Sequence, residues 1–126
     1  MNKPITILYV DDEPTNLLLF NIHFQKKYKV ITSLSGSEGL KILKDQPDIN
    51  VVVSDMKMPG MNGIEFIKAA KVDFPNIHFY ILTGFDLTDE IAQALESKLI
   101  LKYFSKPFNV GLIEQTITEA LVVAEE

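Results

Sequence analysis

Residues 49–63 read Ile-Asn-Val-Val-Val-Ser-Asp-Met-Lys-Met-Pro-Gly-Met-Asn-Gly, and this stretch decides the fold class. Its three consecutive valines are β-branched and have no polar residue between them. Such a run is typical of a strand covered on both faces, as strands of parallel sheets are. The Pro and Gly residues that follow Asp55 indicate a tight loop. Because ligands of open α/β sheets bind beyond the carboxyl ends of the strands, Asp55 is positioned to meet one.

Four more apolar runs predict strands, at residues 5–10, 30–34, 77–82 and 99–104. Each predicted strand is followed by a predicted helix, at residues 15–28, 35–46, 62–74 and 87–97 and after residue 109. Ser35, Asn62 and Asn109 are the expected N-terminal caps of the second, third and fifth helices. Strands and helices therefore alternate along the chain. This alternation predicts the α/β class: one doubly wound (βα)5 domain over residues 1–126, with a five-stranded parallel sheet and helices on both faces.

Composition excludes several classes of function. The chain has 126 residues, which is enough for one domain with a real core, and its net charge of −5 argues against direct binding of nucleic acid. It has no cysteine, so disulfides and thiolate metal sites are excluded. No apolar run approaches the ~20 residues that span a bilayer, and the first residues lack the features of a signal peptide. We expect a cytoplasmic protein that does not insert into membranes.

Polar residues gather at the predicted strand ends. Asp11 and Asp12 follow the first strand, Asp55 ends the third, Thr83 the fourth and Lys106 the fifth. In a parallel sheet these ends lie along one edge. Three carboxylates there repel one another unless a cation intervenes, and an all-oxygen cluster suits Mg²⁺.

A carboxylate at such a site can also act as a nucleophile toward phosphorus and form an aspartyl phosphate. The oxygens of the transferred group then need fixed positive charge and hydrogen-bond donors. Mg²⁺, the Lys106 ammonium and the Thr83 hydroxyl would supply these. Composition and spacing alone do not choose which Asp reacts.

The four motifs, taken in order, resemble the receiver domain of response regulators of two-component signal transduction systems. They are the acidic pair at residues 11–12, Asp55 before the loop at residues 58–63, Thr83 followed by a small residue, and Lys-Pro-Phe at residues 106–108. Each motif is weak alone, but all four at strand ends are specific, and the match covers essentially the whole chain. The resemblance implies a flavodoxin-like fold and a phospho-accepting role in His-Asp phosphorelay signalling.

The resemblance also implies residue roles. Asp55 would accept the phosphoryl group, with Mg²⁺ held by Asp12, by Asp11 partly through water, by Asp55 and by the backbone carbonyl of Lys57. Lys106 would pair with the phosphoryl oxygens. The domain would catalyse only its own phosphorylation and dephosphorylation, without turning over a separate substrate as an enzyme does.

Switching would involve two more residues. The Thr83 hydroxyl would turn toward the phosphoryl group, and Tyr103 would move inward with it. The Lys106-Pro107 bond is usually cis in this family. The resemblance further implies a histidine kinase or phosphotransfer protein as donor, a downstream effector domain or protein, and a homodimer through the surface of the fourth helix, fifth strand and fifth helix.

Lys57 and Phe85 occupy variable positions that border the site in this family. One is long and cationic, and the other is bulky and apolar. We expect them to hinder attacking water and to slow self-dephosphorylation. Whether the chain is a single-domain regulator or the receiver of a longer regulator or hybrid kinase stays open.

Two other classes of function remain as rivals. The first is a receiver-like interaction domain that no longer needs phosphate, although such domains typically lose an Asp or the Lys. The second is another class of enzyme. A flavodoxin-like FMN protein would carry a Ser/Thr/Gly-rich loop after the first strand, where this chain is acidic. An aspartate-dependent phosphatase would carry a second Asp at the position of Lys57.

Overall fold

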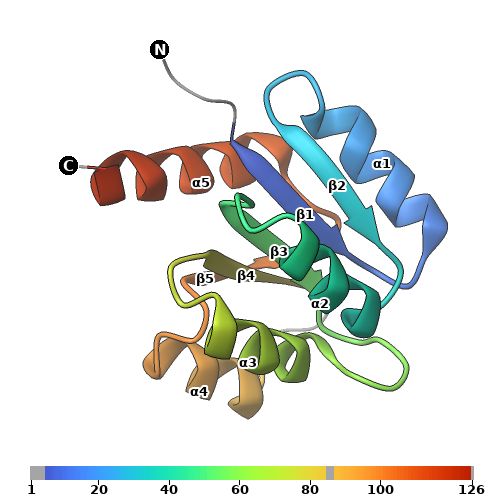
Figure 1. Ribbon diagram of the computed structural model, residues 1–126, viewed down its shortest axis with the longest axis vertical. Coiled ribbons are helices and arrows are strands. Elements are labelled where there is room, and N and C mark those ends of the chain that lie inside the picture. The colour runs from blue at the N-terminus through green and yellow to red at the C-terminus, as the bar shows by residue number, and fades with distance from the viewer. Residues whose placement is uncertain (1–4, 85–86, 126) are drawn as a thin grey trace.

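The computed structural model describes residues 5–84 and 87–125, with side chains up to residue 121. Within these ranges five strands alternate with five helices (Figure 1). The strands are β1 (Thr6–Val10), β2 (Lys29–Ser33), β3 (Val51–Asp55), β4 (His78–Thr83) and β5 (Lys102–Ser105). The helices are α1 (Pro14–Phe24), α2 (Gly36–Asp45), α3 (Gly63–Asp73), α4 (Asp89–Glu96) and α5 (Val110–Glu125). None of the helices in the described ranges has the length and apolarity needed to cross a bilayer.

The strands form one sheet in the order β2-β1-β3-β4-β5, and every neighbouring pair is parallel. This confirms the predicted doubly wound (βα)5 architecture, which is flavodoxin-like. Every residue of β3, the central strand, is buried, as its unbroken apolar run predicted. Because all strands run in one direction, their carboxyl ends meet at one edge of the sheet, where Asp55 ends β3.

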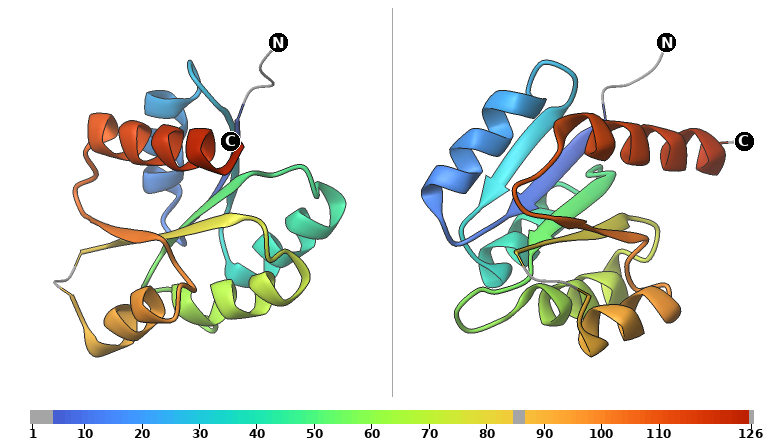
Figure 2. Two further views of the ribbon diagram at one scale, coloured as in Figure 1. Left: turned by 90° about the vertical axis from the view of Figure 1, so that its left-hand side faces the viewer. Right: turned by 180° about the vertical axis from the view of Figure 1, so that it is seen from behind.

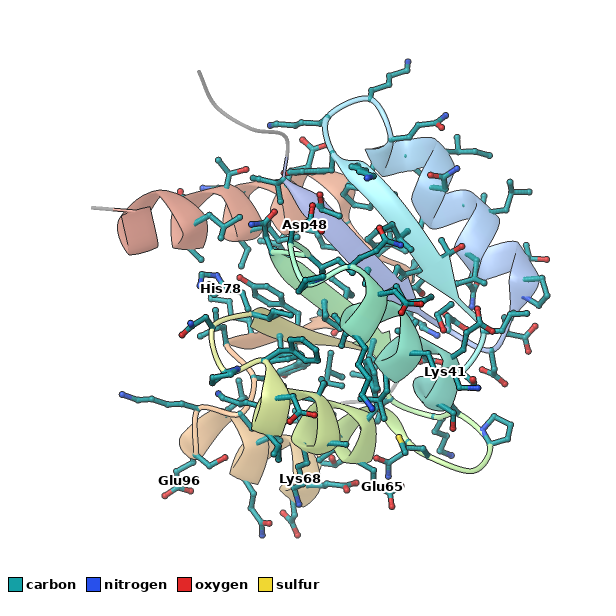
Figure 3. The ribbon with its side chains drawn as sticks, viewed as in Figure 1. Lys41, Asp48, Glu65, Lys68, His78 and Glu96 are labelled. Carbon is teal, nitrogen blue, oxygen red and sulfur yellow. The ribbon has the colours of Figure 1, made fainter. Side chains whose placement is uncertain are left out.

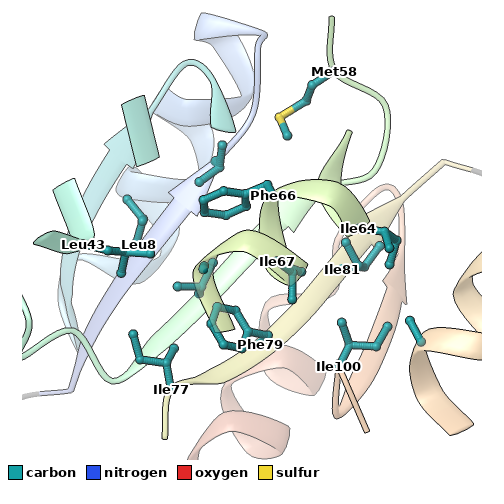
Figure 4. Close-up of a cluster of buried hydrophobic side chains, with 14 of the residues drawn as sticks. Leu8, Leu43, Met58, Ile64, Phe66, Ile67, Ile77, Phe79, Ile81 and Ile100 are labelled. Carbon is teal, nitrogen blue, oxygen red and sulfur yellow. The ribbon is translucent and has the colours of Figure 1, made fainter. Parts of the chain in front are cut away.

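Helices cover both faces of the sheet (Figure 2). An apolar core lies on each face of the sheet, and alternate side chains of β1 point into one or the other. Leu8 and Val10 pack with α2, α3 and α4. Ile7 and Tyr9 pack with α1 and α5. Figure 4 shows the first of these cores, in which Phe66 of α3 lies close to the strands. Two apolar layers thus hold the sheet between them and fix the edge where the strands end.

Helix caps occur at the predicted residues. The Ser35 hydroxyl accepts a hydrogen bond of 3.1 Å from the amide of Glu38. Asn62 and Glu65 form a reciprocal capping box with bonds of 2.9 and 3.0 Å, and Asn109 caps α5. These bonds satisfy amides that have no partner within their own helix.

The first helix is shorter than predicted. It ends at Phe24, not at Tyr28, because the amides of Lys27 and Tyr28 both turn back to the Phe24 carbonyl. The chain then reverses, and the Lys29 amide donates to the carbonyl of Ile5. Pairing of β2 with β1 therefore overrides the apolar pattern that extended the helix.

The fifth strand begins later than predicted. Residues 99–104 were expected to form it, but β5 is Lys102–Ser105. After α4, Lys98 adopts a left-handed conformation with φ of 63°. The next two amides then donate to the Ala94 carbonyl, at 2.9 and 3.3 Å, instead of to the neighbouring strand. The first residues of the apolar run therefore belong to the turn that ends α4, and the strand starts after them.

Gly63 permits the close approach of α3 to the end of β3. A Cβ atom at this position would overlap the carbonyl oxygen of Asp55 and lie 2.8 Å from Cδ1 of Ile81. The Gly63 amide also donates to the carbonyl of Met56, at 2.9 Å. The loop after β3 is therefore closed tightly against the strand that carries Asp55.

Candidate functional site

Three carboxylates converge at the carboxyl edge of the sheet. Asp11, Asp12 and Asp55 each offer an oxygen, and these oxygens all lie within 4.8 Å of one another. Asp11 is fully buried, Asp55 is 6% exposed, and Asp12 is half-buried. The structure therefore brings together the three acids that the strand ends predicted.

Lys106 supplies the cation of this cluster. Its Nζ lies 2.9 Å from Oδ1 of Asp55 and 3.6 Å from Oδ2 of Asp11. Its side chain is only 28% exposed, so the pair with Asp55 is partly screened from water. The loop that carries Lys106 follows β5, and the Lys106-Pro107 peptide bond is cis, as expected. The lysine is held on the side of the cluster that faces β5.

Asp11 is the best-anchored carboxylate of the cluster. Its Oδ1 accepts a bond of 2.9 Å from the amide of Glu13. Its Oδ2 accepts bonds of 2.6 Å from the Tyr9 hydroxyl and 3.1 Å from Nδ2 of Asn16. Charge-assisted bonds of this kind stabilise a buried carboxylate and leave it few lone pairs for a metal.

Sequence reasoning missed Tyr9. In the sequence it is one apolar-looking residue of a buried strand, and its ring does stack on Phe20 with centroids 4.1 Å apart. Only its place two residues before Asp11 could have suggested more, since side chains two apart on a strand share a face. Burial, followed by the bond to Asp11, holds the Tyr9 pKa well above its usual range.

The pKa of Asp55 is raised. Desolvation by burial is the largest cause, and the charge of Asp11 adds to it. The hydrogen bond and charge of Lys106, together with the amide of Met56, oppose the rise but do not cancel it. An ionised Asp55 is therefore poorly compensated by the protein alone, which favours a bound cation.

The remaining predicted residues lie near the edge in different settings. Thr83 ends β4 and is buried, and Lys57 is exposed in the loop after β3. Tyr103 is half-buried on β5 and packs against the core formed with α2, α3 and α4. Phe85, expected to hinder water, lies outside the described residues.

The donor set fits Mg²⁺. It offers three carboxylates and no nitrogen or sulfur ligand, which is the chemistry that a small hard cation prefers. Burial, to which the charge of Asp11 adds, raises the pKa of Asp55, and a bound cation would offset the cost of ionising this carboxyl.

Comparison with known proteins agrees with this geometry. The family model of the response regulator receiver domain matches residues 7–118. The chain belongs to this family. It is a signalling domain with a phospho-accepting function in two-component systems, and the predicted family is confirmed.

Relatives of two lengths match this receiver domain. The sporulation initiation phosphotransferase F of Bacillus subtilis is 37% identical, over 91% of this chain and 92% of the relative. The transcriptional regulatory protein GlrR of Escherichia coli is 30% identical, over 95% of this chain but only 27% of the relative. The chain thus spans about a quarter of the length of such regulators.

Solved structures show the same fold. A response regulator receiver domain protein from Clostridium thermocellum superposes with a TM-score of 0.85. It is 28% identical, over 96% of this chain and 97% of that one. The receiver fold therefore extends across almost the whole chain.

Proposed function

We propose that Asp55 is the residue of this receiver that accepts the phosphoryl group. The observation that carries the proposal is the place of its carboxylate, which ends the central strand 2.9 Å from the Lys106 ammonium and beside Asp11 and Asp12. Asp11 accepts three hydrogen bonds from the donors around it, whereas the shortest side-chain contact of Asp55 is with the Lys106 ammonium. An Asp55 oxygen attacks phosphorus, the phosphorus–nitrogen bond to a donor histidine breaks, and the imidazole nitrogen takes up a proton.

Asp12 and Asp55, with the backbone carbonyl of Lys57, would hold Mg²⁺, and Asp11 would act partly through water. The bound ion would neutralise charge on the transferred group. Lys106 would exchange its bond with Asp55 for one with a phosphoryl oxygen, and the Thr83 hydroxyl would donate to another. Such preorganised charges stabilise phosphoryl transfer.

Phosphorylation adds roughly −1.5 to −2 charge at neutral pH. In the proposed switch, Thr83 and Tyr103 respond to that charge and shift the population of two conformations. The surface of α4, β5 and α5 then binds an effector domain or protein, or a second copy of the chain. Residues 1–126 act as one receiver domain in the cytoplasm, and the domain catalyses only its own phosphorylation and dephosphorylation.

A histidine kinase or phosphotransfer protein would dock on α1, whose first turn adjoins the acidic edge. Leu18, Leu19 and Ile22 are 58%, 42% and 48% exposed, an unusual density of large apolar side chains on a surface helix. Leu19 also lines a cleft of about 370 Å³ that reaches Lys106 and Phe108. The partner would cover these three apolar side chains and bring its phosphohistidine over the edge.

The first test is intact mass after incubation with Mg²⁺ and acetyl phosphate. One phosphoryl adduct on the wild type, and none on Asp55→Asn, is expected. An adduct that persists on Asp55→Asn would contradict the assignment of this residue. No adduct on a wild type that binds Mg²⁺ would favour the rival phosphate-independent interaction domain, unless a phosphorylated histidine protein still transfers to it.

Docking is tested separately with Leu19→Glu. This change should slow transfer from a phosphorylated histidine protein and leave acetyl phosphate labelling unchanged, because the small donor needs no docking surface. Val72→Glu is the matched control, since Val72 is 80% exposed on α3. Equal transfer rates for the two variants would refute docking on α1.

A further inference from the structure

A second cleft lies at the other end of the sheet from Asp55. It has a volume of about 480 Å³ and runs between β4, β5 and the later turns of α5. His78, the first residue of β4, lines it and pairs in register with Val51, the first residue of β3. Figure 3 shows the His78 side chain at this end of β4, near α5. The cleft is therefore separate from the carboxyl edge of the sheet, where Asp55 ends β3.

Two buried polar atoms of the lining lack a partner. Among the residues that the structure describes, Oη of Tyr80 and Nδ1 of His78 accept and donate no hydrogen bond. Tyr80 is fully buried, and Thr116, beside it in the lining, does find a partner in the carbonyl of Leu112. Buried polar groups are almost always satisfied, so these two atoms point to a molecule that satisfies them.

Both groups are neutral near pH 7. Burial raises the pKa of Tyr80 to about 12 and lowers the pKa of His78. The phenol therefore stays a donor, while the neutral imidazole offers Nδ1 as acceptor or donor. Together they can pair with a ligand that carries both a hydrogen-bond donor and an acceptor.

The rest of the lining narrows the class of ligand. Leu101, Ala120 and the Tyr80 ring form apolar walls, and the ring is fixed by stacking on Phe104 with centroids 5.6 Å apart. The charged lining residues, Lys102 of β5 and Glu119 of α5, have opposite signs. A net charge on the ligand gains little from such a pair. The volume lies in the usual range for small-molecule sites, roughly 300–1,000 Å³.

We propose that this cleft binds an uncharged, planar small molecule through an amide-like edge. The donor and acceptor of that edge pair with Tyr80 Oη and His78 Nδ1, and the planar body lies against Leu101 and Ala120. This site is independent of the proposed chemistry at Asp55. It would let the domain respond to a small molecule as well as to phosphorylation.

Benzamide is the probe, because it joins an aromatic body to an amide edge, and benzoate is its charged counterpart. Titration of the ¹⁵N-labelled protein should give saturable shifts at the amides of His78, Tyr80, Leu101 and Lys102, with a dissociation constant of about 1 mM for so small a ligand. Benzoate should bind much more weakly. Shifts that do not saturate at these amides, or equal binding of benzoate, would overturn the proposal.

Tyr80→Phe should weaken benzamide binding about tenfold, the effect of one lost hydrogen bond. The variant should fold, because it removes a hydroxyl that the described residues leave without a partner. Tyr103→Phe is the matched control on the opposite face of the sheet and should bind as the wild type does. Ala120→Leu, which fills the cleft from α5, should abolish binding. Undiminished binding by Tyr80→Phe and Ala120→Leu would place benzamide elsewhere.

Discussion

The Tyr9 hydroxyl donates a hydrogen bond of 2.6 Å to Oδ2 of Asp11, so a side chain of the buried sheet orients the innermost acid of the carboxylate cluster. Both residues are completely buried. The pair links the core formed with α1 and α5 directly to the acidic cluster, because the Tyr9 ring stacks on Phe20 of α1.

Tyr9→Phe keeps the ring and removes this bond. Since a hydrogen bond to a charged group contributes about 1.5–3 kcal/mol, the free energy of unfolding should fall by that amount. Tyr28→Phe is the matched control, because the Tyr28 hydroxyl meets only uncharged oxygens on α5, and its loss should cost about 0.5–1.5 kcal/mol. Urea denaturation without Mg²⁺ measures both. Equal decreases in the free energy of unfolding for the two variants would show that the bond from Tyr9 to the Asp11 carboxylate is no stronger than a bond between uncharged groups.

Asp55→Asn should stabilise the metal-free protein at neutral pH. The folded-state pKa of Asp55 is raised above 3.8, mainly by burial, so the folded protein holds this proton to a higher pH than the unfolded chain does. Stability is therefore lost as the pH rises from about 4 toward 7. In thermal melts with EDTA, the stability of Asp55→Asn relative to the wild type should therefore increase as the pH rises from about 4 to about 7. If the difference in stability between the two proteins is the same at about pH 4 and about pH 7, the pKa of Asp55 is not raised in the folded state.

Gly63→Ala should destabilise the fold, by about 1–3 kcal/mol or more, because its Cβ would collide with the carbonyl of Asp55. Phosphorylation of Asp55 should slow as well, since α3 must move away from the strand end. Gly111→Ala is the control: its nearest neighbour would be Asn109 Oδ1, at 3.6 Å, and the helical propensity of Ala in the first turn of α5 should add no more than about 1 kcal/mol to stability. Calorimetry measures the stability of both variants. An unchanged stability of Gly63→Ala would contradict the close approach of α3 to the end of β3.

His78 should make stability depend on pH in the opposite sense to Asp55. Burial lowers its folded-state pKa below 6.5, so the unfolded chain takes up the proton first as the pH falls. Stability should thus decline below about pH 6.5 and level off once the folded form is protonated as well. In His78→Asn this contribution is absent. Urea denaturation of both proteins at about pH 7.5 and about pH 5.5 provides the measurement, and parallel pH profiles would argue against a depressed pKa.

Lys57→Asn combined with Phe85→Glu should shorten the life of the phosphorylated protein. The two smaller or more polar side chains would admit and orient water, and a tenfold faster loss corresponds to a barrier lower by about 1.4 kcal/mol. The decay of the phosphoryl adduct, followed by mass spectrometry, gives the rate. An unchanged half-life would mean that neither position limits the access of water.

The sequence by itself determined the α/β class, the strand that carries Asp55, and the acids, threonine and lysine of the edge. These follow from local signals: an unbroken valine run, caps at Ser35 and Asn62, and polar residues directly after apolar ones. Because parallel strands end at one edge, order along the chain was enough to predict that Asp11, Asp55 and Lys106 meet.

Only the tertiary structure decided what depends on contacts between distant segments. The bond from Asn16 to Asp11 needs the first turn of α1 to lie against the end of β1, and the Tyr9 ring is held there by stacking on Phe20 of α1. The late start of β5 follows from a left-handed Lys98 and from the hydrogen bonds that the next two amides donate to the Ala94 carbonyl. The cleft beneath α5 is lined by both Tyr80 and Ala120, which lie forty residues apart in the sequence. Burial, the quantity that shifts pKa values and leaves hydroxyls without partners, belongs to the packed molecule and not to any stretch of its sequence.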